Sequence, residues 1–306
     1  MVHAIKHSEK KNNIYFILIF ILTIIGFEKS SFSNDDLLQE GKILSHIAGC
    51  YGCHTSKNNA EFSGGYEIKT KYGIFITPNI TKNTNYGIGK WDKTDFIKAI
   101  KTGISPENKP YYPSFPYAWY KNMEEEDIIK IFKYIKSKPP INIEQENHKL
   151  KFPYKLRRLN WIWRILNERI SYSLELKNMK NNKNLLFRGK YLVEVVGHCG
   201  TCHSPRTWFS IVQNKSDLSG RKESFKNAKD GAPNITSIKK AGIGLWSKSD
   251  ITFYLQTGIK PDGDFANENM QSIIDKGTSH LNKKDLEAIA VYLLNNNKKI
   301  KSATVE

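Results

Sequence analysis

Two copies of the motif C-x-x-C-H, at residues 50–54 and 199–203, use all four cysteines of this 306-residue chain. They constrain its fold more than any other feature. The spacing is typical of covalent haem attachment, in which both thiols form thioethers and the adjacent histidine binds the iron. We therefore expect two covalently bound haem c groups. The residues predicted to hold them are Cys50, Cys53 and His54, and Cys199, Cys202 and His203.

Other uses of paired cysteines fit the sequence less well. A four-cysteine zinc site usually brings its two pairs within about 20 residues of each other, whereas these motifs lie far apart in the chain. A thioredoxin-like C-x-x-C is normally single and lies in a βαβ pattern that this sequence lacks. Two structural disulfides fit an oxidising compartment, but they do not require a histidine after each pair.

The N-terminus predicts export. It has a basic start that includes Lys6 and Lys10, an apolar run at residues 14–27, and small residues at 31–33. The run is short for a membrane span and fits the core of a signal peptide. We expect residues 1–33 to be a signal peptide and the mature chain to begin at Asn34, with an uncleaved anchor as the alternative. Both interpretations predict that the protein is in the periplasm, the compartment in which haem is attached to C-x-x-C-H.

The chain is strongly basic, with a formal net charge of +17. A basic exported protein is suited to docking on acidic partners or on an anionic membrane face. Abundant Lys, Asn and Ile also reflect AT-rich coding, so the charge alone assigns no partner. Export makes a nucleic-acid partner improbable, and the length suits two small domains.

The rest of the chain is an internal repeat. Pro-Asn-Ile-Thr at residues 78–81 recurs at 233–236, Gly-Ile-Gly-x-Trp at 87–91 recurs at 242–246, and Thr-Gly-Ile at 102–104 recurs at 257–259. A capping-box pattern follows each tryptophan, formed by Asp92 with Asp95 and by Ser247 with Asp250. The two helices that begin there are predicted to end at Gly103 and Gly258.

Further helices are predicted at residues 37–48 and 185–196, before the motifs, and at 125–135 and 283–294, at the end of each repeat. Each repeat holds about 100 residues, too few for a robust core, so we expect the haem to supply the apolar centre. The predicted organisation is a domain at 34–140, a linker at 141–184 and a second domain at 185–306.

The mature chain resembles bacterial dihaem class I cytochromes c. It is most similar to the cytochrome c subunits of alcohol, gluconate and aldehyde dehydrogenases. The resemblance rests on the repeated motifs, on the run at residues 112–117 and on Ser279-His280-Leu281. It implies a mainly α fold with a tandem pair of cytochrome c domains, each wrapped around one haem. It also implies an electron-transfer protein, not an enzyme, whose redox partners are a dehydrogenase subunit and an oxidase or quinone-linked complex.

The sixth iron ligands differ between the two repeats. Met270 stands at the ligand position that the resemblance implies, and Phe115, at the same spacing from its tryptophan, cannot bind iron. We favour Met123 as the first haem's ligand, although alignment to the final helix matches it to Leu281, a core position. In the alternative Met123 packs, and the first haem is open or takes another group. His46, His148 and His198 are less favoured donors.

The linker contains an amphipathic pattern. Leu156, Leu159, Trp163, Leu166 and Ile170 form an apolar stripe flanked by basic residues such as Arg157 and Arg158. The stripe is predicted either to pack across the two domains, which we favour, or to lie on a membrane surface or in a partner groove. Residues 181–184 are predicted to be a polar hinge.

We therefore expect a periplasmic dihaem c-type cytochrome, either free or associated with the inner membrane, that relays electrons from a dehydrogenase toward quinone or a terminal oxidase. The alternative is a haem enzyme or sensor with an open first haem, peroxidase-like or sulfur-oxidising. Two bound sixth-position methionines favour the carrier, whereas one leaves chemistry at the first haem available.

Overall fold

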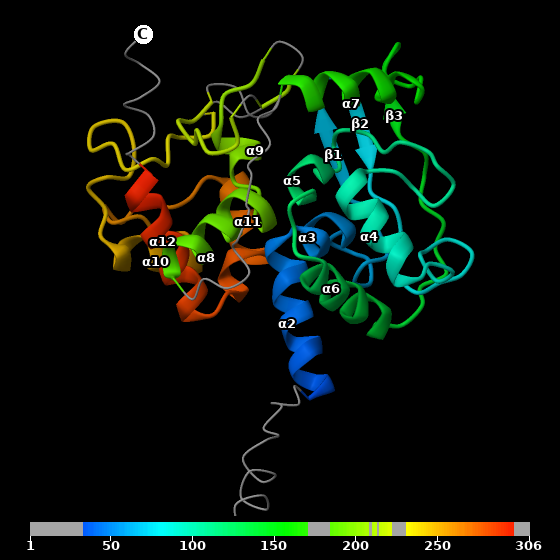
Figure 1. Ribbon diagram of the computed structural model, residues 1–306, viewed down its shortest axis with the longest axis horizontal. Coiled ribbons are helices and arrows are strands. Elements are labelled where there is room, and N and C mark those ends of the chain that lie inside the picture. The colour runs from blue at the N-terminus through cyan, green and yellow to red at the C-terminus, as the bar shows by residue number, and fades with distance from the viewer. Residues whose placement is uncertain (1–32, 171–183, 208–209, 213, 222–230, 297–306) are drawn as a thin grey trace, which may run out of the picture. The chain divides into compact units, whose positions relative to one another are not determined.

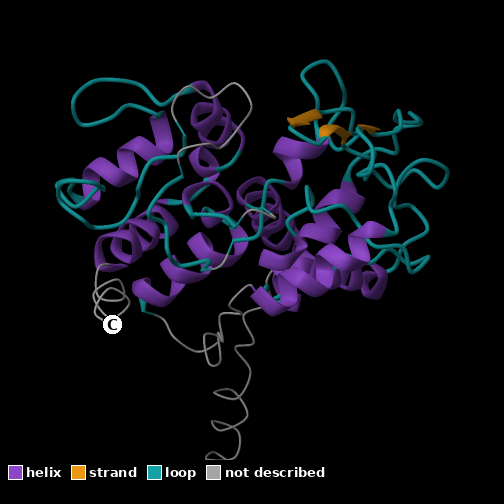
Figure 2. Cartoon of the chain, turned by 90° about the horizontal axis from the view of Figure 1, so that it is seen from above, coloured by secondary structure: helices purple, strands orange, loops and turns teal. Residues whose placement is uncertain are grey.

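Helices at the predicted places dominate the structure, a computed structural model of the chain (Figure 1). It describes residues 33–170, 184–207, 210–212, 214–221 and 231–296. Strands are few and short in this described part (Figure 2), so the mainly α class is confirmed. Residues 38–306 belong to one unit, and every contact discussed below lies within it.

The helices form two similar sets along the chain. The first set is α2 (Asn34–Ile47), α3 (Cys50–His54), α4 (Lys93–Thr102), α5 (Tyr117–Tyr120) and α6 (Glu125–Ser137). The second set is α8 (Leu185–Tyr191), the π-helical η1 (Leu192–Val196), α9 (Gly200–His203), α10 (Lys248–Thr257), α11 (Glu268–Lys276), the 3-10 turn η2 (Thr278–His280) and α12 (Lys283–Asn295). Helix α7 (Leu159–Ile170) lies between the two sets in the sequence.

The predicted helix caps are confirmed in both sets. Capping boxes begin α4, through Asp92 and Asp95, and α10, through Ser247 and Asp250. Each satisfies two backbone N–H groups that the first turn leaves without partners. At the other end, Gly103 adopts a left-handed conformation with φ of 64°, which glycine adopts without steric cost. The same short sequence signals therefore fix the ends of the two equivalent helices.

A close helix crossing occurs in each set. A Cβ atom placed on Gly41 of α2 would lie 2.2 Å from the Lys130 carbonyl oxygen of α6. A Cβ atom on Gly189 of α8 would lie 1.9 Å from the Ala288 carbonyl oxygen of α12. Only glycine permits these approaches, because any side chain would occupy the space of the facing backbone. The helix before each C-x-x-C-H motif is thus held tightly against the last helix of its own set.

A small antiparallel sheet was not anticipated from the sequence. Strands β1 (Glu67–Thr70) and β2 (Gly73–Ile76) form a hairpin, and β3 (Lys149–Leu150) from the predicted linker pairs with β2. Ile68 faces Phe75 across the hairpin, and Gly73 faces Leu150. The linker therefore returns to the first half of the chain before α7 begins.

Buried side chains of both halves join in one hydrophobic cluster, which includes Leu44, Ile128, Leu192 and Leu286. Such continuity buries more apolar surface than a unit of about 100 residues provides alone. Within the described ranges, no helix has both the length and the apolar character needed to cross a membrane. The predicted signal peptide falls almost wholly outside those ranges, as do residues 181–183 of the predicted hinge.

Helix α7 turns inward a face that only partly matches the predicted stripe. Trp163 and Leu166 of the stripe are half-buried, but Leu156, which precedes the helix, and Leu159 are exposed. The fully buried positions are Asn160 and Asn167. Polar and aromatic anchoring contacts, described below, hold the helix in this rotation. The side chain of Ile170, the last member of that stripe, lies outside the described part.

Candidate haem attachment sites

The first C-x-x-C-H motif forms the short helix α3. The Nδ1 atom of His54 lies 2.8 Å from the carbonyl oxygen of Pro78. A carbonyl oxygen only accepts hydrogen bonds, so Nδ1 must carry the proton and donate it. This tautomer leaves the Nε2 lone pair available for a metal, and the hydrogen bond fixes the plane of the ring. The loop that contains Pro-Asn-Ile-Thr thus orients the predicted iron ligand.

The second motif repeats this geometry. The Nδ1 atom of His203, at the end of α9, lies 2.7 Å from the carbonyl oxygen of Pro233. The imidazole is again restricted to the tautomer with a free Nε2 atom. Two histidines predicted as iron ligands from the sequence are therefore held by equivalent proline carbonyls. The repeated Pro-Asn-Ile-Thr sequence predicts loop backbone near each haem, but nothing in it identifies the proline carbonyl as the partner of the histidine.

Each proline loop is fixed by its own asparagine. In the first half, the Asn79 side-chain oxygen accepts hydrogen bonds from the Thr81 backbone N–H at 2.9 Å and from the Thr81 hydroxyl at 2.8 Å. In the second half, Asn234 accepts the same two bonds from Thr236, at 2.8 Å and 2.6 Å. Such local turns are a general property of asparagine. Here they position the carbonyl that the histidine needs.

One further backbone hydrogen bond holds each proline loop in place. The N–H of Ile80 donates to the carbonyl of Phe62 at 2.8 Å, and the N–H of Ile235 donates to the carbonyl of Leu218 at 3.0 Å. Phe62 and Leu218 are fully buried, and both have positive φ angles, of 61° and 53°. Positive φ is rare for large apolar residues, so the burial of each side chain must outweigh local strain. No local sequence signal predicts these two residues.

Burial determines the ionisation of the motif residues. It lowers the pKa values of His54 and His203, which favours the neutral imidazole that binds metals. It also raises the pKa values of the thiols of Cys50 and Cys199 to about 12. No disulfide joins any two of the four cysteines, all of which the structure describes.

The donor set itself is unlike that of a zinc site. Within the described residues, which include every cysteine, no three His, Cys, Asp or Glu side chains gather into a metal-binding group. Each motif instead offers two thiols and one oriented histidine, which is the set that covalent haem attachment uses. The residues present therefore fit two haem c groups, and the structure gives no support to a four-cysteine zinc site.

The predicted sixth ligands occupy different settings. Equivalent contacts keep the two halves in register past α4 and α10: Ile104 pairs with Pro110, as Ile259 pairs with Phe265. At the same separation along the chain, Phe115 matches Met270. Both are half-buried and pack against the hydrophobic cluster. Met270 lies in the first turn of α11, where the side chain of Asn267 caps its backbone N–H at 2.9 Å.

Met123 lies just before α6 and is 2 % exposed. Its backbone N–H donates to the Tyr120 carbonyl at 2.9 Å. Leu281, which stands at the matching place before α12, is also buried in the hydrophobic cluster. This match supports the alternative in which Met123 packs. Its role as an iron ligand stays a prediction.

The three less favoured histidines all have other partners. His46 Nδ1 lies 2.8 Å from the Lys276 carbonyl, and its ring stacks on His280 at 3.8 Å. His148 Nδ1 accepts the backbone N–H of Ile76 at 3.1 Å. The ring of His198 packs edge-on against Tyr120, with centroids 5.5 Å apart. These contacts assign each ring a structural role.

The two motifs meet at His198, the residue directly before the second motif. A Cβ atom on Gly49, directly before the first motif, would lie 3.8 Å from His198 Nε2. The Ala48 carbonyl accepts the hydroxyl of Tyr120. Tyr120 and His198 are in edge-to-face contact with centroids 5.5 Å apart. The segments that precede Cys50 and Cys199 are therefore packed together through Gly49, Tyr120 and His198.

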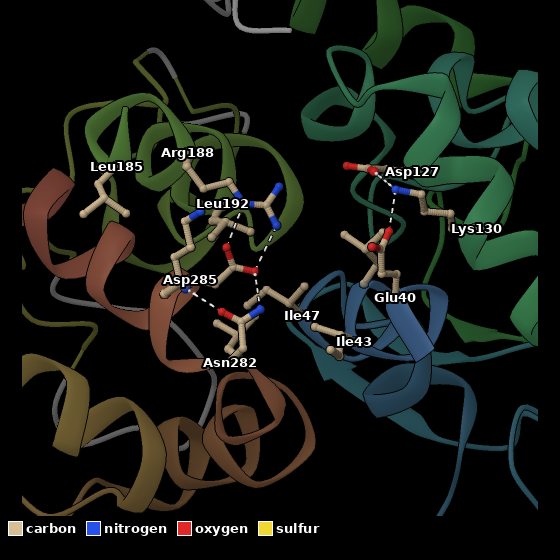
Figure 3. A pocket seen from close by; sticks show the side chains of 13 residues that line it. Glu40, Ile43, Ile47, Asp127, Lys130, Leu185, Arg188, Leu192, Asn282 and Asp285 are labelled. Atoms are coloured by element: carbon tan, nitrogen blue, oxygen red, sulfur yellow. Dashed lines mark hydrogen bonds and ion pairs between the residues drawn. The ribbon is translucent and has the colours of Figure 1, made fainter. Parts of the chain in front are cut away.

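A cavity of about 360 Å³ lies between the helices that precede and follow the motifs (Figure 3). Glu40 pairs with Lys130 at 2.7 Å, and Lys130 also reaches Asp127 at 3.5 Å. On the opposite wall, Arg188 holds Asp285 in a two-pronged ion pair at 2.8 Å and 2.9 Å. These charged side chains form ion pairs with one another, so the cavity offers no evident ligand site. The ion pairs in its walls instead connect neighbouring helices.

No family model matches the chain, but several known proteins are similar to it. It is 34 % identical, over 83 % of both chains, to a dihaem cytochrome c-type protein of Cereibacter sphaeroides. It is 32 % identical to the fructose dehydrogenase cytochrome subunit of Gluconobacter japonicus, over 84 % of this chain and 52 % of the relative. It is 30 % identical to the gluconate 2-dehydrogenase cytochrome c subunit of Pantoea cypripedii, over 94 % of this chain and 66 % of that one. The chain thus spans only about half of the fructose dehydrogenase subunit.

Proposed function

The chain belongs to the family of dihaem c-type cytochromes, and from this premise we propose that it relays electrons from a dehydrogenase toward the respiratory chain. The observation that carries the proposal is the duplicated hydrogen bond from a motif histidine to a proline carbonyl. Each bond presents a neutral imidazole in one tautomer, as an axial haem ligand requires. A chain with two such sites is built to hold two haems.

The roles of the residues follow from this arrangement. Cys50 and Cys53 attach one haem, and Cys199 and Cys202 attach the other, while His54 and His203 are the proximal ligands. When bound, each haem supplies a one-electron redox centre whose potential depends on its axial ligands and burial. We assign Met270 as the sixth ligand at the second site. At the first site, Met123 and an open position are the alternatives, and the packing of Met123 supports the open one.

The proposed domains are residues 34–140 and 185–306, each wrapped around one haem and joined by the linker at 141–184. Their contact at His198 supports a relay inside one chain. The ring of His198 lies beside Gly49 and packs edge-on against Tyr120, so the segments that immediately precede the two attachment motifs are in contact. The hydroxyl of Tyr120 donates to the Ala48 carbonyl in the same place. We propose that electrons pass between the two sites through these packed residues.

The partner and compartment are further parts of the proposal. Relatives named as cytochrome subunits of fructose and gluconate dehydrogenases support a dehydrogenase as the electron donor. Quinone or a terminal oxidase is the proposed acceptor. Residues 1–33 are proposed to direct the chain to the periplasm, where thioether attachment takes place. Association with the inner membrane would bring the protein close to both partners.

A test begins with the haem-loaded chain and two double variants, Cys50→Ala/Cys53→Ala and Cys199→Ala/Cys202→Ala. We expect two covalent haems per chain in the wild type and one in each double variant. Electron flow from a dehydrogenase to an acceptor should fail in both variants if the haems act in series. A wild-type chain with fewer than two covalent haems, or variants that both transfer electrons at the wild-type rate, would overturn the relay.

A second candidate function rests on Phe115. If the first iron has no methionine ligand, it is accessible to diatomic gases or peroxide, as in a haem enzyme or sensor. The placement of Phe115 at the position of Met270 is the observation that favours this candidate. Turnover of peroxide by the purified wild type that is lost in the Cys50→Ala/Cys53→Ala variant would establish it.

A further inference from the structure

An exposed apolar surface surrounds the start of α7, outside the proposed haem sites. We define it as the α7 surface, and its members are Phe152, Tyr154, Leu156, Leu159, Trp161, Ile162 and Ile165. Phe152 is 75 % exposed, Ile162 is 56 % exposed and Ile165 is 51 % exposed. Exposed apolar residues are ordinary when they are scattered, whereas these seven fall within residues 152–165, and Trp161, Ile162 and Ile165 share one side of α7 by helical spacing. Helix α7 runs along the upper edge of the view in Figure 1.

The α7 surface faces outward because the opposite face of the helix is anchored. Arg164 donates to the Thr102 carbonyl, and its guanidinium lies 5.1 Å from the centroid of the Tyr117 ring. Trp163 makes an edge contact with the same ring, with centroids 6.4 Å apart. Before the helix, Arg157 donates to the Pro110 carbonyl at 3.0 Å. Rotating α7 to bury Ile162 and Ile165 would break these contacts, so their exposure is built into the fold.

The charge around the α7 surface is mainly positive, although Glu168 of α7 pairs with Arg164 at 3.8 Å and Glu146 pairs with Lys149 at 2.6 Å. From Lys149 to Arg164 the sequence contains six basic residues and no Asp or Glu. Lys151, Lys155 and Arg158 are exposed, and no ion pair to a described residue is found for any of them. Aromatic and aliphatic side chains thus share a short segment with three exposed cations that no acidic side chain of the described residues neutralises.

We propose that the α7 surface binds an anionic lipid membrane, with α7 lying flat in the headgroup region. This inference does not depend on the haem sites. Large aromatic residues, aliphatic residues and flexible cations are the composition of interfacial helices, which insert apolar side chains below the headgroups while Lys and Arg contact lipid phosphates. The 12 residues of α7 are suited to lying on a bilayer and are too few to cross it. A protein groove would instead favour a surface with few lysines at its centre.

The test uses the purified holoprotein and sedimentation with vesicles of phosphatidylcholine alone or with added phosphatidylglycerol. Every sample keeps the same N-terminus, so residues 1–33 contribute equally throughout. We expect binding to the anionic vesicles that weakens at high salt. Ile162→Ser/Ile165→Ser should abolish it. Lys155→Gln/Arg158→Gln should weaken it on the order of 20-fold, because each cation near an anionic surface contributes about fivefold.

A matched control replaces two exposed apolar residues outside the α7 surface. Leu245 is 76 % exposed and Phe253 is 51 % exposed, so Leu245→Ser/Phe253→Ser removes comparable apolar area. This control should bind vesicles as the wild type does. Far-UV circular dichroism and haem content, unchanged in all variants, exclude misfolding and separate this test from that of the electron relay.

Two results would overturn the membrane proposal. One is a failure of the wild type to bind anionic vesicles, or binding by the Ile162→Ser/Ile165→Ser variant that equals that of the wild type. The other is co-purification with a dehydrogenase subunit that this variant loses while no preparation binds vesicles. In that case the α7 surface belongs to a protein interface, whatever the outcome for the two haem sites.

Discussion

The sixth ligand of the first haem is open to a direct test, because the structure separates packing from ligation at Met123. Its side chain is 2 % exposed inside the hydrophobic cluster, so Met123→Ala removes buried volume and should cost about 2–5 kcal/mol of unfolding free energy. Met123→Leu nearly conserves volume and should cost less than about 1.5 kcal/mol. At roughly 2–4 °C per kcal/mol, the leucine variant should lower Tm by less than about 6 °C.

The leucine variant therefore keeps the fold and removes only the thioether sulfur. We expect Met123→Leu to leave unchanged the number of low-spin, sulfur-ligated haems seen by optical and EPR redox titration, because Met123 packs as Leu281 does. Met270→Leu, the matched variant in the second half, should abolish the sulfur-ligated signal. Phe115→Met, which supplies sulfur at the position equivalent to Met270, should add a second sulfur-ligated haem.

Carbon monoxide binding gives an independent count of open irons. The wild type and Met123→Leu should each bind one equivalent per chain, and Met270→Leu should bind two. A Met123→Leu protein that folds normally, loses a sulfur-ligated haem and gains a second equivalent of bound carbon monoxide would refute this reasoning. Met123 would then be the ligand that the sequence favours.

Three further predictions concern stability, all measured by urea denaturation. Gly189→Ala should lower the unfolding free energy by about 1–3 kcal/mol, because the new Cβ atom would overlap the Ala288 carbonyl. This cost should exceed the gain of about 1 kcal/mol from the higher helix propensity of alanine. A more stable variant would contradict the close helix crossing. Burial, together with positive neighbours, lowers the pKa of His46 to about 4, so the folded state favours the neutral ring. The unfolding free energy should therefore fall by an amount on the order of 2–3 kcal/mol as the pH falls from about 6.5 toward 4. The variant His46→Gln should show a smaller loss over the same pH range. Arg188→Met leaves the buried carboxylate of Asp285 unpaired and should cost about 3–5 kcal/mol, whereas an unchanged midpoint would show that the pair contributes little.

Local signals account for the parts of the fold that the sequence predicts. The capping boxes at Asp92 and Ser247 and the left-handed Gly103 depend on residues within one helical turn. The attachment residues follow from motif spacing in the same way. Their assignment as haem ligands stays a prediction, supported by the orientation of His54 and His203.

Features that depend on distant segments escaped prediction. The carbonyl that orients His54 belongs to Pro78, and it is positioned through Phe62, whose positive φ has no local signal. Gly41 gives no indication in the sequence that it faces the backbone of α6. The rotation of α7 was predicted only in part, because hydrophobic periodicity counts apolar residues, whereas Arg164 also provides contacts that hold the helix, together with Trp163 of the predicted stripe.

The two attachment sites share the same histidine hydrogen bonds, so the difference at Phe115 bears on the direction of the proposed electron relay. Both sites share the histidine tautomer, the proline carbonyl and the asparagine turn, so these features do not distinguish their potentials. A methionine ligand raises the potential of a histidine-bound haem. If Met270 provides it only at the second site, electrons are drawn from the first half to the second. The donor should then dock near the motif of residues 50–54, and the acceptor near that of residues 199–203.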